Sequence, residues 1–450
     1  MKACVLVAEI GSTTTIVNAF GGRPLAFLGQ GAAATTVARG DVALGLNAAK
    51  ADLARALNAE NIEYDRFLAT SSAAGGLCMT VHGLVYDMTV KAGQEAALGA
   101  GANIALATAG KMDEDDLAQI CAAKPNLILL SGGTDYGDKD VALHNAQMLA
   151  GMANLPPVIY CGNIQNHNKI IEIFDKAGKK LYIAENVYPR LDELNIAPVR
   201  RLIHQAFEEH ITSAPGMENI RRLVDGAIMP TPGAVMEAAA LMHEFLGDLV
   251  VADVGGATTD IHSVAEGDED VAAMQISPEP LAKRTVEGDL GLYVNAKKLA
   301  QAVGFDVLSK ELGFDIAPIF EDYKPVPETA QQLALTTRLA YHAASRAMIR
   351  HAGQLRHSFS PRGRQTHAIG KDLTAVKYLI ATGGALTRLP NAPNVLDELT
   401  KINASGNMLF PKPGMLQILK DEKYIMASLG VLSREYPEDA RRLLKELITC

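Results

Sequence analysis

The sequence has 450 residues, of which 48% are hydrophobic and 21% charged, enough apolar material for two to four domains with separate cores. Its 42 basic and 51 acidic residues give a formal net charge of −9 without any long basic block, which argues against a nucleic-acid-binding protein. Five cysteines without a Cys-x-x-Cys pair, a first strand directly after Met1-Lys2, and no apolar run near the roughly 20 residues that cross a bilayer predict a cytoplasmic protein without a signal peptide or membrane anchor.

The N-terminal segment, residues 1–76, begins with a predicted β-hairpin. An apolar run leads to Glu9, a turn follows at Gly11, and hydroxyl residues pass into a β-branched strand that ends near Val17. The first strand of this hairpin therefore ends at an acid. Other expected elements of the segment are a strand near 25–31, a helix over 41–57 with Asp41 as its N-cap, and a strand at 67–76.

Strands and helices alternate between residues 77 and 190. Five strands separated by helices predict a doubly wound parallel sheet, which we interpret as a Rossmann-like domain inserted into the first domain. Ligands of such sheets bind at the carboxyl ends of the strands, so the loops 131–135 and 161–163 are expected on one rim. The expected strands are 77–84, 103–108, 127–130, 158–160 and 180–184.

Helices are expected over residues 191–248, which rejoin the first domain, and the opening pattern then recurs. A buried strand ends at Asp253, Gly255 and Gly256 allow a tight turn, and a β-branched strand resumes at Thr259. The backbone amides of such a turn suit phosphate oxygens, and an acid at the strand end can hold Mg²⁺ through its waters. One hairpin of this kind is usually an ordinary turn, whereas a matched pair favours two loops that face one phosphate chain.

Two other phosphate-binding loops do not fit the sequence. A P-loop needs Gly-Lys followed by Ser or Thr, but the Gly-Lys pairs here continue with Met112, Lys180 and Asp372. A Rossmann loop needs a helix after its glycines, and residues 258–264 are poor helix formers. A nucleotide held between two hairpins is therefore the favoured interpretation.

A third strand, at residues 377–382, runs into the glycine pair Gly383-Gly384. With the two hairpins, this order resembles the actin, sugar kinase and heat-shock chaperone ATPase superfamily. Four motifs narrow the resemblance to the MutL family, also called GlmL, of glutamate mutase accessory proteins, which is distinct from the mismatch-repair protein of that name. The motifs are Asp253-Val-Gly-Gly-Ala-Thr-Thr-Asp260, Arg284-Thr-Val-Glu-Gly-Asp-Leu-Gly291, Leu130-Ser-Gly-Gly-Thr-Asp135 and Gly370-Lys-Asp-Leu-Thr374.

The resemblance implies an α/β, actin-like duplicated ATPase fold with the Rossmann-like insert at 77–190. It adds a second ATPase domain at 249–420 and C-terminal helices at 421–450 that close onto the first domain. The small residues of 424–430 suit close helix packing at a hinge. The insert also resembles a cobalamin-binding domain in element order but lacks the Asp-x-His-x-x-Gly motif. The near match at Asp260-Ile-His262 is taken as a coincidence, and no directly bound cobalamin is expected.

The resemblance also implies a site for ATP and Mg²⁺. Asp253 and Glu9 would be its catalytic acids and would orient the metal through water. Glu9 replaces the Asp of the superfamily, and its extra methylene moves the carboxylate by about 1.5 Å. The residues expected to bind the cofactor are Gly11, Ser12, Thr13, Thr14, Gly255, Gly256, Ala257, Thr258, Arg284, Gly383 and Gly384.

The function that the resemblance implies is an ATP-dependent accessory or reactivating chaperone for an adenosylcobalamin-dependent mutase or aminomutase. Glutamate mutase is the family partner, and ornithine and lysine aminomutases are alternatives. Slow hydrolysis is expected because residues 228–231 offer no acid to position the attacking water. A small-molecule kinase of the same fold and a non-catalytic ATP-binding assembly subunit remain open.

Two further segments carry expectations. The insert is expected to recognise the mutase rather than the nucleotide, because the nucleotide motifs lie outside it. The basic stretch at 354–371 predicts a surface loop, with a docking role as the alternative.

Overall fold

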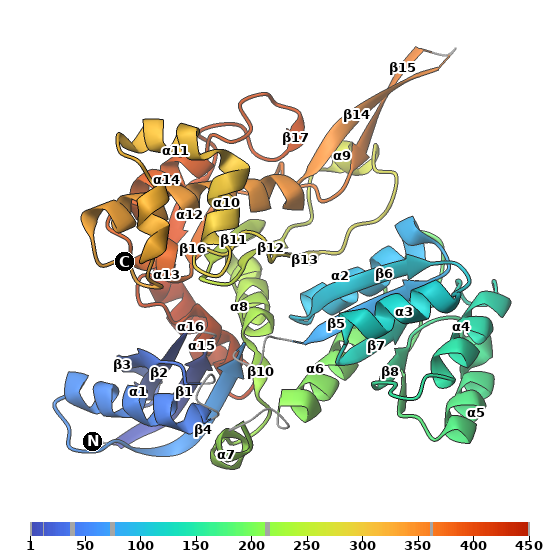
Figure 1. The fold of residues 1–450 in the computed structure, drawn as a ribbon, viewed down its shortest axis with the longest axis horizontal. Coiled ribbons are helices and arrows are strands. Elements are labelled where there is room, and N and C mark those ends of the chain that lie inside the picture. Colours follow the sequence, from blue (N-terminus) through green and yellow to red (C-terminus); the bar gives the residue numbers. More distant parts are fainter. Residues whose placement is uncertain are drawn as a thin grey trace.

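A computed structural model describes residues 2–11, 13–36, 41–72, 77–211, 217–360 and 363–448 of the chain. Its strands form three five-stranded sheets and a three-stranded one, surrounded by helices (Figure 1). The strands are β1 (Lys2–Ile10), β2 (Thr14–Gly21), β3 (Ala26–Ala34), β4 (Glu63–Ser71), β5 (Cys78–Gly83), β6 (Asn103–Ala109), β7 (Leu127–Leu130), β8 (Val158–Tyr160), β9 (Leu181–Ile183), β10 (Met229–Pro230), β11 (Leu249–Val254), β12 (Thr259–Val264), β13 (Ala282–Glu287), β14 (Gly353–Ser360), β15 (Gly363–Ile369), β16 (Tyr378–Thr382), β17 (Met408–Leu409) and β18 (Gln417–Lys420).

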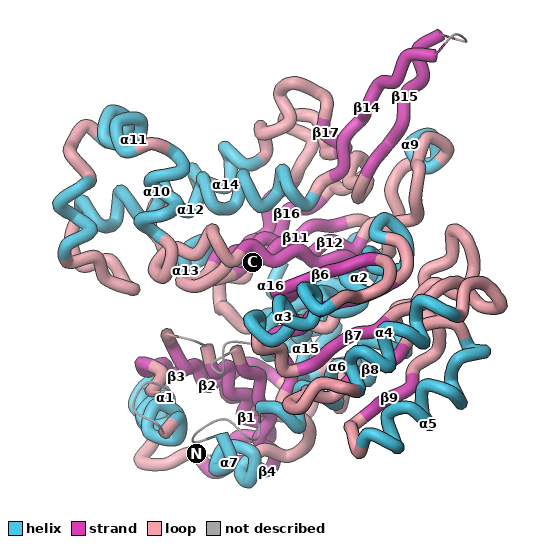
Figure 2. The backbone as a smooth tube through the Cα atoms, turned by 45° about the vertical axis from the view of Figure 1, so that its right-hand side comes forward, coloured by secondary structure: helices cyan, strands magenta, loops and turns pink. Residues whose placement is uncertain are grey.

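The helices lie between these strands and cover their faces (Figure 2). The α-helices are α1 (Val42–Ala56), α2 (Lys91–Gly99), α3 (Glu114–Ala123), α4 (Asp140–Ala150), α5 (His167–Ala177), α6 (Ala197–Ile211), α7 (Met217–Leu223), α8 (Thr231–Leu246), α9 (Glu269–Ala272), α10 (Ala296–Val303), α11 (Phe305–Leu312), α12 (Ala330–His351), α13 (Gly384–Arg388), α14 (Ala392–Leu399), α15 (Met426–Leu432) and α16 (Pro437–Ile448). In the described part of the chain, none of them has both the length and the apolar surface that a membrane crossing requires.

Two of the sheets repeat one topology. The first has the order β10-β4-β1-β2-β3 and another has β13-β12-β11-β16-β18. In each, the first strand forms an antiparallel hairpin with the second, the third strand pairs antiparallel with the second, and the other neighbour of the first strand, β4 or β16, runs parallel to it. This repetition confirms the duplicated actin-like fold. The segment limits inferred from the sequence at 76, 190, 248 and 420 stay predictions.

The inserted domain is the doubly wound parallel sheet that the sequence predicts. Its strand order is β6-β5-β7-β8-β9, and every neighbouring pair is parallel. The loops after β7 and β8 meet, because the Ile164 N–H donates to Asp135 Oδ1 at 2.9 Å and the Tyr136 N–H donates to Asn163 Oδ1 at 3.2 Å. This places both loops on one rim of the sheet. Its helix α2 lies against β13 of the other half of the chain.

The C-terminal helix α15 packs closely on α8. A Cβ atom added to Gly430 would lie 1.8 Å from the Ala234 carbonyl oxygen, so only glycine allows this approach. Helix α15 also contacts β1 and β4, and α16 contacts α8. The close helix packing expected for residues 424–430 is therefore present, and it fastens the C-terminal helices to the first sheet.

The basic stretch at 354–371 is a β-hairpin rather than a loop, which corrects the sequence interpretation. Strands β14 and β15 pair antiparallel along their length and project from the body (Figures 1 and 2). Lys371 does not belong to the exposed basic surface, because its Nζ is buried and donates to the carbonyl oxygens of Ala265 at 2.6 Å and Pro280 at 2.7 Å. The motif that contains Lys371 therefore holds a neighbouring loop in place.

Candidate functional site

Both hairpins turn in the same way after their first strand. The Gly11 N–H donates to the Thr14 carbonyl at 3.0 Å, and the Gly255 N–H donates to the Thr258 carbonyl at 3.0 Å. A Cβ atom at Gly11 would lie 2.8 Å from the Thr14 oxygen, and one at Gly255 would lie 3.2 Å from the Thr258 oxygen. The tightness of the turn thus explains both glycines, and it leaves hydroxyl and amide groups at the tip of each hairpin.

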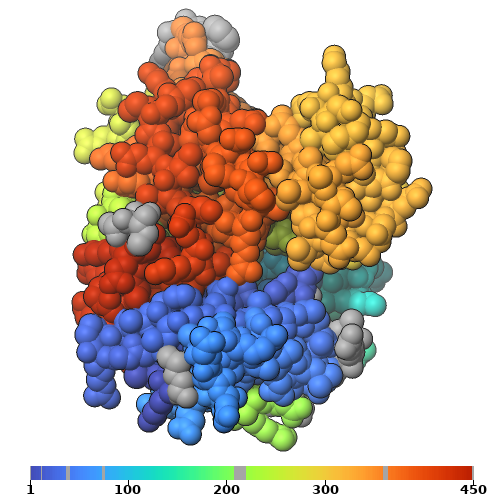
Figure 3. Space-filling view, turned by 90° about the vertical axis from the view of Figure 1, so that its left-hand side faces the viewer, coloured from blue at the N-terminus to red at the C-terminus, as the bar shows by residue number. Residues whose placement is uncertain are grey.

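A cavity of about 610 Å³ separates the two hairpins. Figure 3 shows the surface hollowed where the first sheet, in blue, meets the orange and red second half of the chain. Of the residues that the sequence predicts for the site, Glu9, Gly11, Thr13, Thr14, Asp253, Gly255, Gly256, Ala257, Thr258, Arg284 and Gly384 line this cavity. Ser12 lies outside the described residues.

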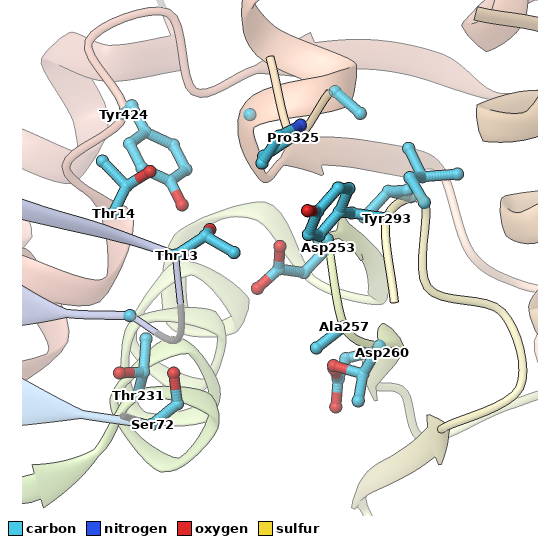
Figure 4. A pocket seen from close by; sticks show the side chains of 18 of the residues that line it. Thr13, Thr14, Ser72, Thr231, Asp253, Ala257, Asp260, Tyr293, Pro325 and Tyr424 are labelled. Carbon is cyan, nitrogen blue, oxygen red and sulfur yellow. The ribbon is translucent and has the colours of Figure 1, made fainter. Parts of the chain in front are cut away.

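Asp253 lies at the centre of the cavity, between Thr13 of the first hairpin and Tyr293 (Figure 4). Asp260 is directly opposite it on the neighbouring strand. Burial, and after it the negative charge of Asp260, raises the pKa of Asp253 from 3.8 to about 7, while the charge of Arg284 acts in the opposite sense. The ionised carboxylates of Asp253 and Asp260 thus repel each other, and a bound cation would stabilise both.

Glu9 occupies the equivalent place in the first hairpin, but hydrogen bonds from α15 and β2 hold one of its carboxylate oxygens. Its Oε1 accepts hydrogen bonds from the Ser428 N–H at 3.0 Å, the Ser428 hydroxyl at 2.6 Å and the Asn18 amide at 3.2 Å. Burial raises the pKa of Glu9 from 4.5 to about 7, against the lowering effect of the Ser428 hydrogen bond. The extra methylene of Glu9 therefore lets it reach α15, and Oε2 is the oxygen that can serve the cavity.

The acids of the cavity fit Mg²⁺ better than a metal held entirely by protein. Glu9, Asp253 and Asp260 all line it, yet within the described ranges no three His, Cys, Asp or Glu side chains are grouped as a metal cage. Mg²⁺ keeps several waters and binds through one or two carboxylates together with substrate phosphates. Hard oxygen donors with excess negative charge are the donor set that this ion needs.

The far end of the cavity has a backbone wall. Gly384 begins α13, and a Cβ atom added there meets no atom within 4 Å, so this position faces open space. Gly383 stands behind it with φ +82°, and a Cβ atom there would lie 2.5 Å from Asp253 Oδ1. Gly383 therefore shapes the turn, whereas Gly384 forms the surface. Pro325, Val326 and Leu333 give an apolar wall that suits a nucleotide base.

A family model described as "MutL protein" matches residues 5–448 of the chain. The curated protein "Protein MutL" of Clostridium tetanomorphum is 36% identical over 458 residues, which cover 98% of each protein. The chain belongs to the MutL family. The assignment agrees with the motifs around Asp253 and Arg284, both of which line the cavity.

Solved structures resemble this MutL-family chain only distantly. A nucleotide-free acetone carboxylase is 12% identical with a TM-score of 0.40, covering 96% of this chain and 70% of that chain. A glycerol dehydratase reactivase is 10% identical with a TM-score of 0.34, covering 96% and 100%. The ethanolamine utilization protein EutJ from Carboxydothermus hydrogenoformans is 10% identical with a TM-score of 0.30, covering 95% and 88%.

Several residues of the MutL-family cavity were not among the sequence predictions. Asp260 could have been found, because in a hairpin that turns between Gly255 and Thr258 it must lie opposite Asp253. Tyr424 lines the cavity with φ +52°, a strained conformation for a bulky residue that the sequence does not reveal. Others that line it are Ser72, Asn103, Thr231, Tyr293 and Arg388.

The insert also reaches this cavity, although the sequence motifs expected to bind the nucleotide lie outside it, and its recognition of the mutase stays a prediction. Gly101, just after α2, and Asn103, the first residue of β6, belong to the lining. Gly101 has φ +91°, and a Cβ atom there would lie 2.8 Å from the Pro230 side chain, so a glycine is needed where the insert meets the start of α8. His262, by contrast, lies within β12 at 0% exposure and does not line the cavity.

Proposed function

We propose that this MutL-family chain is an ATP-dependent accessory protein that reactivates an adenosylcobalamin-dependent mutase or aminomutase. The observation that carries the proposal is the pair of equivalent hairpins, from two sheets of one topology, that face one cavity. Family membership supports the accessory role, and the similarity to a curated MutL protein extends over nearly the whole chain. The partner is of the glutamate mutase type, with ornithine and lysine aminomutases as alternatives.

The nucleotide in this proposal is ATP with Mg²⁺. Asp253 and Oε2 of Glu9 would hold Mg²⁺ through its waters, and the ion would neutralise charge on the phosphates. The backbone amide of Gly256 and the hydroxyls of Thr13 and Thr14 would donate to phosphate oxygens. The amides of Gly11 and Gly255 close their turns, and the Thr258 hydroxyl donates to Asp260 Oδ2 at 2.8 Å. Gly384 would pass close to the adenosine. Phosphoryl transfer depends mainly on positioning and charge, so these groups suffice without a covalent nucleophile.

Hydrolysis in this site is slow because the segment before the second hairpin supplies hydroxyls instead of an acid. Strand β10 pairs with Thr70 and Ser71, and the Thr231 hydroxyl donates to Thr70 Oγ1 at 3.1 Å. Glu237, later in α8, is half-exposed, and its Oε1 lies 3.6 Å from Arg434 Nη2. Hydroxyls can hold a water molecule, but they are poor general bases at neutral pH.

The test uses ATP labelled on its γ-phosphate. We expect the purified protein to release labelled inorganic phosphate slowly and only with Mg²⁺, and Asp253→Asn to slow this release on the order of 10²- to 10³-fold. Transfer of the label to an added small acceptor would show a kinase, and tight binding without turnover would show a non-catalytic assembly subunit. Failure to bind the nucleotide would overturn the proposal altogether.

A further inference from the structure

Helix α2 of the insert is fastened to β13 by a buried row of charges. Lys283 Nζ lies 3.2 Å from Glu95 Oε1 on α2 and 2.7 Å from Glu279 Oε2. Lys91 Nζ, on the first turn of α2, lies 2.5 Å from Glu279 Oε1. Apart from Lys91, the side chains of this row are almost fully buried. Their exposed fractions are 11% for Lys283, 7% for Glu95 and 3% for Glu279. The insert and the second sheet therefore share a desolvated interface.

The next residue of β13, Arg284, connects that interface to the cavity. Arg284 is 1% exposed, and its Nε and Nη2 donate to Asp260 Oδ1 at 2.8 and 2.5 Å. Its Nη1 donates to the carbonyl oxygens of Leu98 and Ala102 at 3.1 Å each, at the C-terminal end of α2. One side chain thus holds a carboxylate of the second phosphate hairpin and two carbonyls of the insert.

These contacts form a continuous path. Asp253 lies opposite Asp260, Asp260 pairs with Arg284, and Arg284 holds the end of α2, which continues into Gly101. Asp253, Asp260, Arg284 and Gly101 all line the cavity. A ligand in the cavity can therefore reach both ends of the Arg284 contact network.

We propose that Arg284 is a positioning residue that couples occupation of the phosphate end of the cavity to the hold on the insert. This inference rests on the proposed nucleotide function and names how the same site would act on the partner-specific part of the chain. In this proposal the insert contacts the mutase and also responds to whether a nucleotide is bound in the cavity.

The direction follows from the strengths of the competing hydrogen bonds. A phosphate is negatively charged and can accept two parallel hydrogen bonds from a guanidinium, so it competes for Arg284 with the neutral carbonyl oxygens of Leu98 and Ala102. A metal ion beside Asp253 and Asp260 also competes with Arg284 for the charge of Asp260. Both effects draw the guanidinium toward the cavity and away from Leu98 and Ala102. Nucleotide binding would then loosen the end of α2 and free the insert to engage its partner.

The test is hydrogen exchange on the full-length protein, with and without the magnesium complex of adenylyl imidodiphosphate. The reporters are the amides of residues 100–102, of which Gly101 donates to the Leu98 carbonyl. We expect the nucleotide to speed their exchange on the order of tenfold, the effect of losing one charge-assisted hydrogen bond at the lower end of its usual strength. Calorimetric titration of the same nucleotide confirms occupancy in each sample.

Two variants decide whether the response depends on Arg284. Arg284→Lys keeps a positive charge beside Asp260, but its single nitrogen cannot span Asp260 and the α2 carbonyls, so the tenfold response should fall below about twofold at saturating nucleotide. Lys91→Gln breaks another pair of the same interface without touching Asp260, and its response should persist. Equal loss in both variants would overturn the assignment to Arg284.

The wild-type measurement stands even if Arg284→Lys does not fold. Calorimetric binding with unchanged exchange at residues 100–102 would overturn the coupling and leave the proposed function intact. Absence of any nucleotide binding would overturn both.

Discussion

Asp253→Asn should separate the two consequences of placing an acid at the centre of the cavity. The folded protein raises the pKa of this carboxyl from 3.8 to about 7, chiefly by burial and then by the charge of Asp260. Since the folded pKa lies above the unfolded one, the ionised carboxylate destabilises the fold. The penalty is absent below about pH 4, grows as the pH rises and is complete above about pH 7. Asparagine has nearly the same shape and carries no charge.

The size of the effect follows from the shift. A difference of about 3 pKa units corresponds to at most about 4 kcal/mol, and because the cavity opens to solvent we expect about 2 kcal/mol at pH 8. Without ligand, Asp253→Asn should therefore melt a few degrees above the parent at pH 8 and together with it near pH 4. Loss of the same charge should lower Mg²⁺-dependent ATP turnover on the order of 10²- to 10³-fold.

The assay pairs thermal melting from pH 4 to pH 8 with phosphate release. Asp248, at the other end of β11, provides the matched control, because its carboxylate accepts backbone N–H bonds from Glu266 at 3.0 Å and Gly267 at 3.1 Å. Asp248→Asn loses one of these acceptors and should melt lower, by about 1 kcal/mol of stability, with turnover retained. An Asp253→Asn protein that melts below its parent at pH 8, or that turns over ATP normally, would refute the reasoning.

Three other changes test separate parts of the site. Glu9→Gln should keep its acceptor for Ser428 and gain stability as the pH rises above about 4.5, with the full gain above about pH 7. Glu9→Asp should lose roughly 1–3 kcal/mol by withdrawing from Ser428, and equal melting of both variants would contradict the contact. Gly384→Val should weaken ATP binding with little change in melting temperature, and binding as tight as that of the parent would remove Gly384 from the adenosine wall. Gly383→Ala should instead destabilise the fold, because Gly383 has a φ of +82°. Gly430→Ala should cost on the order of 3 kcal/mol because α15 must move off α8, and an unchanged denaturant midpoint would speak against that packing.

Local patterns were sufficient to predict the parts of the fold with strong periodicity. The apolar runs that end at Glu9 and Asp253 became first strands of equivalent hairpins, and β7 and β8 have the limits expected from the sequence. Asp41 caps α1 through a hydrogen bond to the Ala43 N–H at 2.8 Å, as its position before the helix indicated. Short apolar runs and caps reveal themselves because they depend on neighbours in sequence.

The remaining features depend on residues far apart in the chain. Glu9 meets Ser428, 419 positions later, and Arg284 meets Leu98, 186 positions earlier, so no local pattern could indicate either contact. The sequence predicts a loop in place of the β14–β15 ribbon because most of the described residues of this ribbon are exposed or half-buried and give no clear hydrophobic alternation. Such contacts are also what joins the insert to the cavity.

The recovery of activity by an inactivated mutase tests the proposed ATP-dependent reactivation most directly. Glutamate mutase, ornithine aminomutase or lysine aminomutase carrying damaged cobalamin would be incubated with this protein, intact adenosylcobalamin and MgATP. The activity of the mutase would then be followed. We expect activity to return only with all three, and neither adenylyl imidodiphosphate nor the Asp253→Asn protein to support it. Recovery that is equally fast without nucleotide, or no recovery with any of the three mutases, would contradict the proposed ATP-dependent reactivation.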